Sequence, residues 1–362
     1  MRVVIACCGL EHTRRGYESF ARELFSALSG QVDVKLCKGS GKRGLNEVVV
    51  PCLRRDFLSR FMKPDTAYKW EQITFAFALF PYLIVNRTDI VHYSDGTVGN
   101  VLARLLRLTG YRFRLLLSNG GPYHPRHFRP DVFIHQVRQA GFDEALEYGV
   151  ASSRMHLIPY GIAPEQFLSS VAPDTVRRHF GLPQDKFLIL SLAALNSSHK
   201  RLDYLIREVA VLHDASVFLC MAGEPTSETS GLQELAAELL PDRNKFMTVP
   251  RIAIPELLAT ANLFVLASLD EGFGMVLIEA CSSGVPVICN DSAHFRWVMG
   301  DAAHYADMTS PGALASSIRQ IAGQDEVLQR LSAAGKARVE ECYSWKVLVP
   351  RYLKMYESVL SA

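Results

Sequence analysis

The chain has 362 residues, of which 49% are hydrophobic, and its formal net charge at pH 7 is +2. This length favours two domains over one, and the nearly balanced charge excludes a strongly basic nucleic-acid-binding protein. The eight cysteines form no C-x-x-C pair and have no neighbouring histidine pattern. We therefore expect free thiols in a reducing cytoplasm and no zinc site.

The first half of the chain alternates apolar runs with amphipathic stretches, which is the pattern of a parallel sheet with crossover helices. The expected strands are residues 3–8, 32–36, 89–93, 113–118 and 132–135. The expected helices between them include residues 17–28 and 98–108.

The second half repeats this architecture. Its expected strands are residues 187–193, 217–222, 263–267 and 285–290. Its expected helices are residues 203–212, 232–239 and 254–261. We therefore predict an α/β protein with two Rossmann-like domains, residues 1–170 and 171–345. An amphipathic helix at 346–362 follows them.

Residues 268–280, SLDEGFGMVLIEA, connect a buried strand to a helix. In a parallel sheet such a turn lies at the carboxyl edge of the strands, where ligands bind. Gly272 and Gly274 allow the backbone to approach a ligand closely, and the N–H groups that follow suit a phosphate. Glu279, about one turn into the helix, can accept hydrogen bonds from a pair of sugar hydroxyls. The alternative is a capped helix, with Glu271 favoured by the helix dipole and Glu279 solvated.

The Glu-x7-Glu pattern in EGFGMVLIEA, followed by SGVPVI, resembles the retaining glycosyltransferases of group 1, family four. Members of that family use nucleotide sugars and have the GT-B fold, two facing Rossmann-like domains with a C-terminal helix that returns to the first. The resemblance implies that Glu271 contacts the donor sugar and that Glu279 contacts the nucleotide ribose. It also implies that the turn between them holds the diphosphate, with contacts from Gly272, Phe273, Gly274, Met275 and Val276.

A second phosphate-binding element is expected after the first strand of the second half, where residues 195–206 resemble a lysine-containing loop of the family. The resemblance assigns Lys200 to the diphosphate, whose charge an ammonium group neutralises as the glycosidic bond breaks. Ala194 and Leu195 replace the usual arginine, and Arg201 replaces the usual glycine, from where it could compensate. The alternative is a solvated Lys-Arg pair on the surface.

Two weaker donor contacts also follow from the resemblance. Gly223, at the end of the strand 217–222, matches a glycine that borders the nucleotide. Arg251 lies in the segment whose backbone meets the base.

The resemblance assigns the acceptor to the first domain. Residues 8–18 resemble the family's glycine loop, in which Gly16 can approach the donor phosphate or the acceptor closely. Arg14 and Arg15 are candidates for contact with an anionic acceptor, and a solvated loop is the alternative.

Three polar residues near the expected reaction centre remain open to two interpretations. Asn119 lies near the position of a family histidine and could contact the donor. His124, five residues on, is either a surface loop residue or a group that swings in. His92 ends a strand and serves either in core packing or in acceptor binding.

Residues 53–85 interleave basic and aromatic side chains before an apolar run that Pro81 interrupts. That run is too short to cross a bilayer. A basic amphipathic surface would rest on anionic lipid, as expected if the acceptor were lipid-linked. The alternative is an ordinary core helix.

We therefore predict a metal-independent retaining glycosyltransferase that moves a hexose from a nucleoside-diphosphate sugar to a hydroxyl acceptor, with no further cofactor. The chain has no Asp-x-Asp motif for a diphosphate-bound cation, so Lys200 and the helix amides take that role. The predicted location is the cytoplasm, and the lipid-contact interpretation of residues 53–85 would add a peripheral position at the inner face of the membrane. The alternatives are a sugar-nucleotide epimerase of the same architecture and a non-enzymatic nucleotide-sugar binding module.

Overall fold

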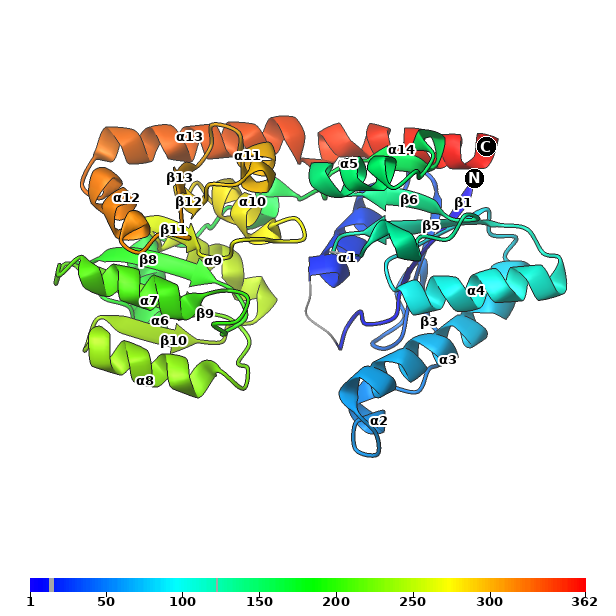
Figure 1. Ribbon diagram of the computed structural model, residues 1–362, viewed down its shortest axis with the longest axis horizontal. Coiled ribbons are helices and arrows are strands. Elements are labelled where there is room, and N and C mark those ends of the chain that lie inside the picture. Colours follow the sequence, from blue (N-terminus) through cyan, green and yellow to red (C-terminus); the bar gives the residue numbers. More distant parts are fainter. Residues whose placement is uncertain (13–15, 122) are drawn as a thin grey trace. The chain divides into compact units, whose positions relative to one another are not determined.

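The computed structural model describes residues 1–12, 16–121 and 123–362. The chain forms two compact units (Figure 1), one of Met1–Gly161 with Trp345–Ala362 and the other of Ile162–Ser344. The C-terminal helix thus belongs to the first unit. Residues 162–170, assigned to the first domain on the sequence, belong to the second unit.

The first unit is built on a sheet of seven parallel strands in the order β3-β2-β1-β4-β5-β6-β7. The strands are β1 (Arg2–Cys7), β2 (Asp33–Lys38), β3 (Glu47–Val49), β4 (Ile90–Tyr93), β5 (Arg114–Asn119), β6 (Phe133–Gln136) and β7 (Met155–Leu157). The helices are α1 (Gly16–Leu28), α2 (Arg55–Leu58), α3 (Pro64–Val85), α4 (Gly96–Thr109), α5 (Gln139–Glu147) and α14 (Trp345–Ser361), with 3₁₀ turns at Pro125–His127 and Ser152–Arg154.

Side chains alternate between the two faces of this sheet, as they must along a strand. Val4 and Val91 belong to one apolar core together with Phe75 and Leu79 of α3. The buried inner side of α3 supports the core-helix interpretation of the apolar run. Pro81 lies inside this helix, where it lacks the N–H that would bond to the preceding turn.

The other face of the sheet is covered by an aromatic cluster that includes the returning helix α14. Phe20 of α1 stacks on Tyr160 with ring centroids 4.0 Å apart, and Trp345 and Tyr352 of α14 lie close to the same ring. Tyr352 and Tyr356 are completely buried. Burial of these large rings holds α14 within the first unit.

The second unit has six parallel strands in the order β10-β9-β8-β11-β12-β13. They are β8 (Phe187–Leu192), β9 (Val217–Ala222), β10 (Asn244–Met247), β11 (Leu263–Leu266), β12 (Val287–Asn290) and β13 (His304–Ala306). The helices are α6 (Pro173–Phe180), α7 (Leu202–Val211), α8 (Thr229–Leu239), α9 (Ile254–Ala259), α10 (Met275–Ser282), α11 (Ala293–Met299), α12 (Ala313–Ile321) and α13 (Asp325–Cys342), with 3₁₀ turns at Pro164–Phe167 and Arg251–Ala253.

The predicted α/β class with two parallel sheets is confirmed. In each sheet the strand order reverses at one point, between β1 and β4 in the first unit and between β8 and β11 in the second. Loops at the carboxyl ends of such strands diverge and leave room for a ligand. Within the described part of the chain, none of the helices has the length and apolarity that crossing a bilayer requires.

Candidate functional site

Two loops that were predicted from the sequence to bind phosphate lie together at the point where the strand order of the second sheet reverses. Residues 193–201 follow β8, and residues 267–274 follow β11. Because β8 and β11 are neighbours in the sheet, both loops leave its carboxyl edge side by side. The carboxyl edge at this point is the expected ligand position of a doubly wound sheet.

An ion pair joins these loops. Lys200 Nζ lies 2.6 Å from Glu271 Oε1, and both side chains are largely buried. The lysine loop is fixed from within, since Asn196 Oδ1 accepts hydrogen bonds from the backbone N–H groups of His199 and Lys200. A cation held in this way is positioned for an anionic ligand before that ligand arrives.

Arg201 is directed elsewhere. Its backbone is left-handed, with a φ of 52°. Its guanidinium donates to the Met308 carbonyl at 2.7 Å and lies over the ring of Tyr204. The side chain is thus held at the Met308 carbonyl, where it contributes to packing between α7 and the segment after β13.

The glycine turn leads directly into α10. Gly274 precedes the helix with a φ of +94°, a conformation that favours glycine. The first N–H groups of α10, at Met275 and Val276, have no acceptor within the helix. A contact missed on the sequence supports this turn, since His294 Nε2 lies 3.2 Å from the Phe273 carbonyl oxygen. Gly272 lies in the same turn, between Glu271 and Phe273.

Glu279 and Arg251 form a second ion pair. Arg251 Nη2 lies 2.7 Å from Glu279 Oε1, and the glutamate side chain is only 2% exposed. Within the described residues, Glu279 Oε2 is buried without a hydrogen-bond partner. A buried carboxylate oxygen without a donor is costly, so this atom is a candidate acceptor for a ligand hydroxyl.

Gly223 brings the ends of β8 and β9 into close contact. A Cβ atom at this position would lie 1.7 Å from the Ala193 carbonyl oxygen, which rules out a larger residue without movement of the backbone. The glycine also donates its N–H to the Met247 carbonyl at 2.9 Å. Gly223 therefore shapes the carboxyl edge of the second sheet through its small size.

In the first unit, Asn119 lines a cavity at the carboxyl ends of β4 and β5. The cavity has a volume of about 280 Å³ and is bordered by Ser94, Gly96, Gly120, Gly121 and Tyr123 together with this asparagine. Asn119 Nδ2 donates to Gln136 Oε1 at 3.1 Å, which fixes the orientation of the amide. Gly16 opens α1 with unoccupied space where a Cβ would be, and the neighbouring Arg14 and Arg15 lie outside the described residues.

His92 and His124, for which the sequence allows two interpretations each, occupy different environments. His92 is completely buried in the aromatic cluster, 2.9 Å from the Tyr356 hydroxyl, and burial lowers its pKa well below the usual value. This environment agrees with a role of His92 in core packing rather than in acceptor binding. His124 is exposed and lies 3.6 Å from Glu144, which matches the surface alternative.

The structure contains a polar cluster around Glu71 that the sequence analysis did not predict. This carboxylate is completely buried and accepts hydrogen bonds from His12 Nε2 at 3.0 Å and from the Arg55 backbone N–H at 2.9 Å. Arg55 Nε also donates to it at 2.5 Å. Although burial raises the pKa of Glu71, these hydrogen bonds bring it below its usual value. No short motif contains these residues, so only their approach in space identifies the cluster.

The same cluster contains the one group of side chains among the described residues that could present ligand atoms to a metal. Cys8, Cys52 and Glu71 bring such atoms within 4.8 Å of one another. However, Glu71 already accepts hydrogen bonds from His12 and Arg55. These bonds satisfy the carboxylate without a metal, so the cluster is better described as a hydrogen-bonded support for α3.

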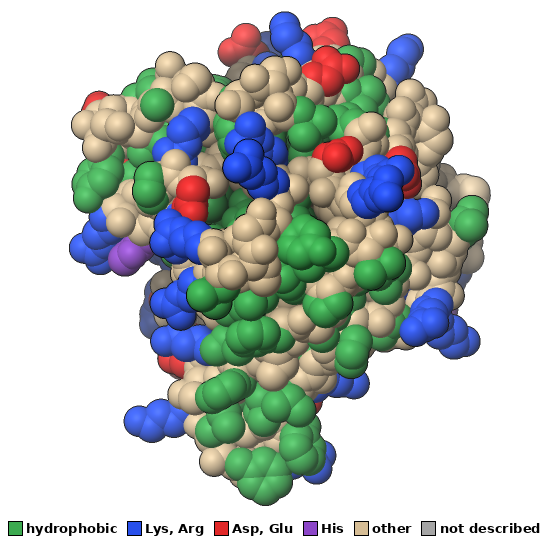
Figure 2. All heavy atoms as spheres, turned by 90° about the vertical axis from the view of Figure 1, so that its right-hand side faces the viewer, with side chains coloured by type: hydrophobic (Ala, Val, Ile, Leu, Met, Phe, Trp, Pro, Cys, Tyr) green, Lys and Arg blue, Asp and Glu red, His purple; other side chains and the backbone are tan. Residues whose placement is uncertain are grey.

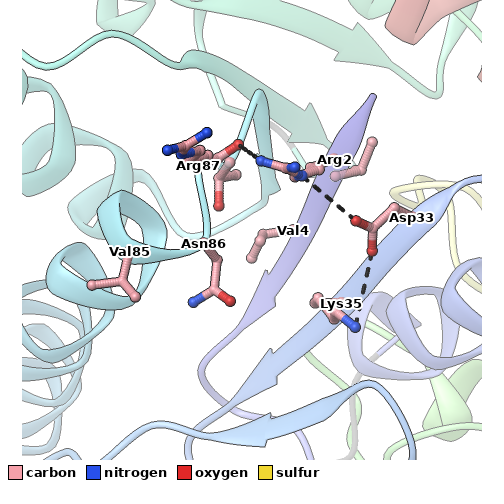
Figure 3. Close-up of a pocket in the computed structure, with 9 residues that line it drawn as sticks. Arg2, Val4, Asp33, Lys35, Val85, Asn86 and Arg87 are labelled. Carbon is pink, nitrogen blue, oxygen red and sulfur yellow. Dashed lines mark hydrogen bonds and ion pairs between the residues drawn. The ribbon is translucent and has the colours of Figure 1, made fainter.

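A larger cavity lies at the opposite edge of the first sheet (Figure 3). Its volume is about 440 Å³, and it is bordered by Arg2, Asp33 and Lys35 of the first strands and by residues 85–88 after α3. Asp33 lies 3.8 Å from Arg2 and 3.9 Å from Lys35, so its carboxylate offsets both cations. The cavity faces the amino ends of the strands and the negative end of α3, which is unfavourable for an anionic ligand.

Comparison with known proteins bears on the second unit most directly. Residues 174–338 match the family model described as glycosyl transferases group 1. The D-inositol 3-phosphate glycosyltransferase of Thermomonospora curvata is 27% identical over 228 residues, 58% of this chain and 52% of that protein. The mannosylfructose-phosphate synthase of Agrobacterium fabrum is 28% identical over 226 residues, 58% of this chain and 49% of that protein. The chain thus spans about half the length of these curated relatives.

Solved structures resemble the whole chain in fold. The sucrose-phosphate synthase from Thermosynechococcus elongatus has a TM-score of 0.83 at 16% identity and covers 99% of both chains. HepE from Anabaena, solved with UDP and glucose, has a TM-score of 0.77 at 15% identity, with 99% of this chain and 100% of that chain covered. The chain therefore shares its fold with these proteins, and its residues 174–338 match the group 1 glycosyl transferase family.

Proposed function

We propose that this protein is a retaining glycosyltransferase that moves a hexose from a nucleoside-diphosphate sugar to a hydroxyl acceptor without a metal ion. The observation that carries the proposal is the placement of Lys200, Glu271 and Glu279 around one glycine turn at the reversal point of the second sheet. The match of residues 174–338 to the group 1 family and the activities named for the relatives support sugar transfer.

In this proposal the donor diphosphate binds where positive charge and free N–H groups converge. The ammonium group of Lys200 and the amides at the start of α10 offer charge-assisted and backbone hydrogen bonds to the phosphates. The diphosphate competes with Glu271 for Lys200, which lies 2.6 Å from that carboxylate. Released from the ion pair, Glu271 would accept hydrogen bonds from the hydroxyl groups of the donor sugar.

Glu279 would hold the nucleotide through a ribose hydroxyl at Oε2, the oxygen that lacks a partner among the described residues. Its other oxygen is kept in position by Arg251. Gly223 would border the nucleotide, and Arg251 would lie beside the base. Asn119 and Gly16 are proposed contacts of the first unit, with the donor and with the acceptor or phosphate, respectively.

The proposed chemical step breaks the bond between the anomeric carbon and the diphosphate oxygen. The acceptor oxygen forms its bond to the same face of that carbon, and the acceptor proton passes to the departing diphosphate oxygen. Stabilising the negative charge that develops on this leaving group is the main task of Lys200 and the α10 amides.

The test is incubation with a panel of sugar nucleotides and candidate hydroxyl acceptors, with released nucleoside diphosphate and glycosylated product measured together. A transferase releases both in equal amounts. An epimerase would change the sugar without releasing the diphosphate, and a binding module would return the donor unchanged. Either result with a donor that binds tightly would overturn the proposal.

We also propose a peripheral contact between the protein and a membrane, through the segment that contains α2 and the start of α3. The mixture of basic and aromatic residues in this segment supports it.

A further inference from the structure

Several large apolar side chains of α2 and α3 remain in solvent. Phe57 and Phe61 are 53% and 73% exposed, and Trp70 is 47% exposed. Figure 2 shows hydrophobic side chains gathered on the lobe at the bottom of the view, where Figure 1 places α2, with Lys and Arg side chains around its border. We refer to residues 53–70 as the α2–α3 tip. Exposed aromatic groups on this scale indicate a surface that contacts something apolar.

The local structure directs these side chains outward. Leu58 is the buried residue of the four-residue helix α2, so its neighbours on the other side are exposed. The rings of Phe57 and Phe61 lie 5.4 Å apart and form a single apolar knob. On α3, Trp70 and Phe77 are seven residues apart and therefore share one helical stripe, while the opposite side is buried in the core.

The charges around this knob are mostly unpaired cations. Arg60, Lys63 and Lys69 are exposed and have no acidic partner within the described residues. Arg54 pairs with Asp56 at 2.6 Å and Arg55 with the interior Glu71. Exposed Asp65 offsets one of these three cations, so the net charge that the tip presents to solvent is positive.

We propose that the α2–α3 tip rests on an anionic lipid bilayer. Phenylalanine and tryptophan partition into the boundary between headgroups and acyl chains, and lysine and arginine at the border of the patch attract anionic headgroups. A protein partner or a second copy of the chain would require an acidic counterpart to these cations, whereas anionic lipid supplies negative charge at every contact.

The position of the tip gives the contact a functional meaning. Arg55 and Glu71 connect it to His12, in the loop that follows β1 at the ligand edge of the first sheet. A bilayer at the tip would therefore lie near that edge and favour an acceptor presented at the lipid surface. This consequence rests on the proposed transferase function, whereas lipid binding does not.

The experiment is flotation of the purified full chain with vesicles of phosphatidylcholine, either alone or mixed with phosphatidylglycerol. We expect binding to the mixed vesicles, weakened by salt because of charge screening. The variant Phe57→Ser/Phe61→Ser should reduce the partition coefficient at least about tenfold. The variant Arg60→Gln/Lys63→Gln/Lys69→Gln should remove the preference for phosphatidylglycerol.

The matched control is Leu45→Ser/Leu108→Ser, which changes two residues of the same unit that are even more exposed, at 89% and 82%, and should bind like the wild type. Wild-type binding by the Phe57→Ser/Phe61→Ser variant, or no wild-type binding to the mixed vesicles, would overturn the lipid contact. Dimers in sedimentation velocity that this variant abolishes, without vesicle binding, would identify a second copy as the occupant instead. Circular dichroism and a thermal melt of every variant check the fold, and nucleotide titration tests the donor site independently.

Discussion

Lys200 Nζ lies 2.6 Å from Glu271 Oε1, although 71 positions separate the two residues in the chain. The pair connects the loops that follow β8 and β11, the two strands at which the order of the second sheet reverses. In the free protein each side chain neutralises the other. An anionic ligand that displaces Glu271 from Lys200 therefore frees a carboxylate at the same moment.

Replacing Lys200 with alanine should reduce sugar transfer by about two orders of magnitude, equivalent to roughly 3 kcal/mol, since one charge-assisted contact to the leaving group is lost. The thermal midpoint should fall, because the largely buried Glu271 carboxylate loses the cation that neutralises it. Initial rates of diphosphate release test the first expectation, and a thermal melt tests the second.

Arg201→Ala is the matched control for Lys200→Ala. Its guanidinium is occupied at the Met308 carbonyl and over Tyr204, so we expect at most a small effect on the rate. Full activity in Lys200→Ala together with a large loss in Arg201→Ala would transfer the phosphate role to the arginine.

Replacing Glu279 and replacing Glu271 should impair different properties of the protein. Glu279→Ala should weaken binding of the nucleoside diphosphate and of the sugar nucleotide alike, because the ribose is common to both ligands. Glu271→Ala should leave the affinity for the nucleoside diphosphate nearly unchanged and reduce turnover and affinity for the sugar nucleotide. Calorimetry with both ligands measures the difference, and equal losses for both ligands in both variants would contradict this division of roles.

The anomeric configuration of the donor should be retained in the product. An inverting transferase needs a base on the side opposite the leaving group. His92 is buried against Tyr356, and His124 is a surface residue beside Glu144, so neither is placed as such a base. Proton NMR of the anomeric signal decides the matter, and an inverted product would direct mutagenesis first to His124.

Acid should destabilise the first unit through its buried histidines. Burial lowers the pKa of His135 to about 3 and that of His92 well below its usual value. Below about pH 6.5 the unfolded chain binds protons that the folded chain excludes, so stability falls as the pH falls through this range. Between pH 7 and pH 5 His135 alone should remove about 2 kcal/mol from the free energy of unfolding, and His92 should act in the same direction.

Urea denaturation at the two pH values measures this loss. His135→Gln should be less stable at pH 7, since His135 Nε2 lies 2.8 Å from the Ile158 carbonyl oxygen, but its stability should depend less on pH. Exposed His127 provides the control, because His127→Gln should keep the wild-type dependence. An unchanged pH dependence in His135→Gln would mean that this imidazole does not stay neutral in the folded state.

The strands were predicted well where they are buried on both faces and poorly at the sheet edges. The range 217–222 coincides with β9, and the other central strands differ from the prediction by a few residues at their ends. The four strands that were missed, β3, β7, β10 and β13, are the outermost strands of the two sheets. Each has three or four residues that are mostly only partly buried, so their hydrophobic pattern is too weak to distinguish them from the surrounding loops.

The sequence by itself determined the strand, glycine turn and helix that carry Glu271 and Glu279, because these elements depend on neighbouring residues and on local backbone preferences. It also determined the alternation of strands and helices that produces two parallel sheets. Only the tertiary structure decided which side chains from distant segments meet. Lys200 reaches Glu271, Arg251 reaches Glu279, Arg201 is drawn to Met308, and His12 and Arg55 converge on Glu71. Side chains from segments this far apart are brought together by strand order and core packing, which no local pattern of residues encodes.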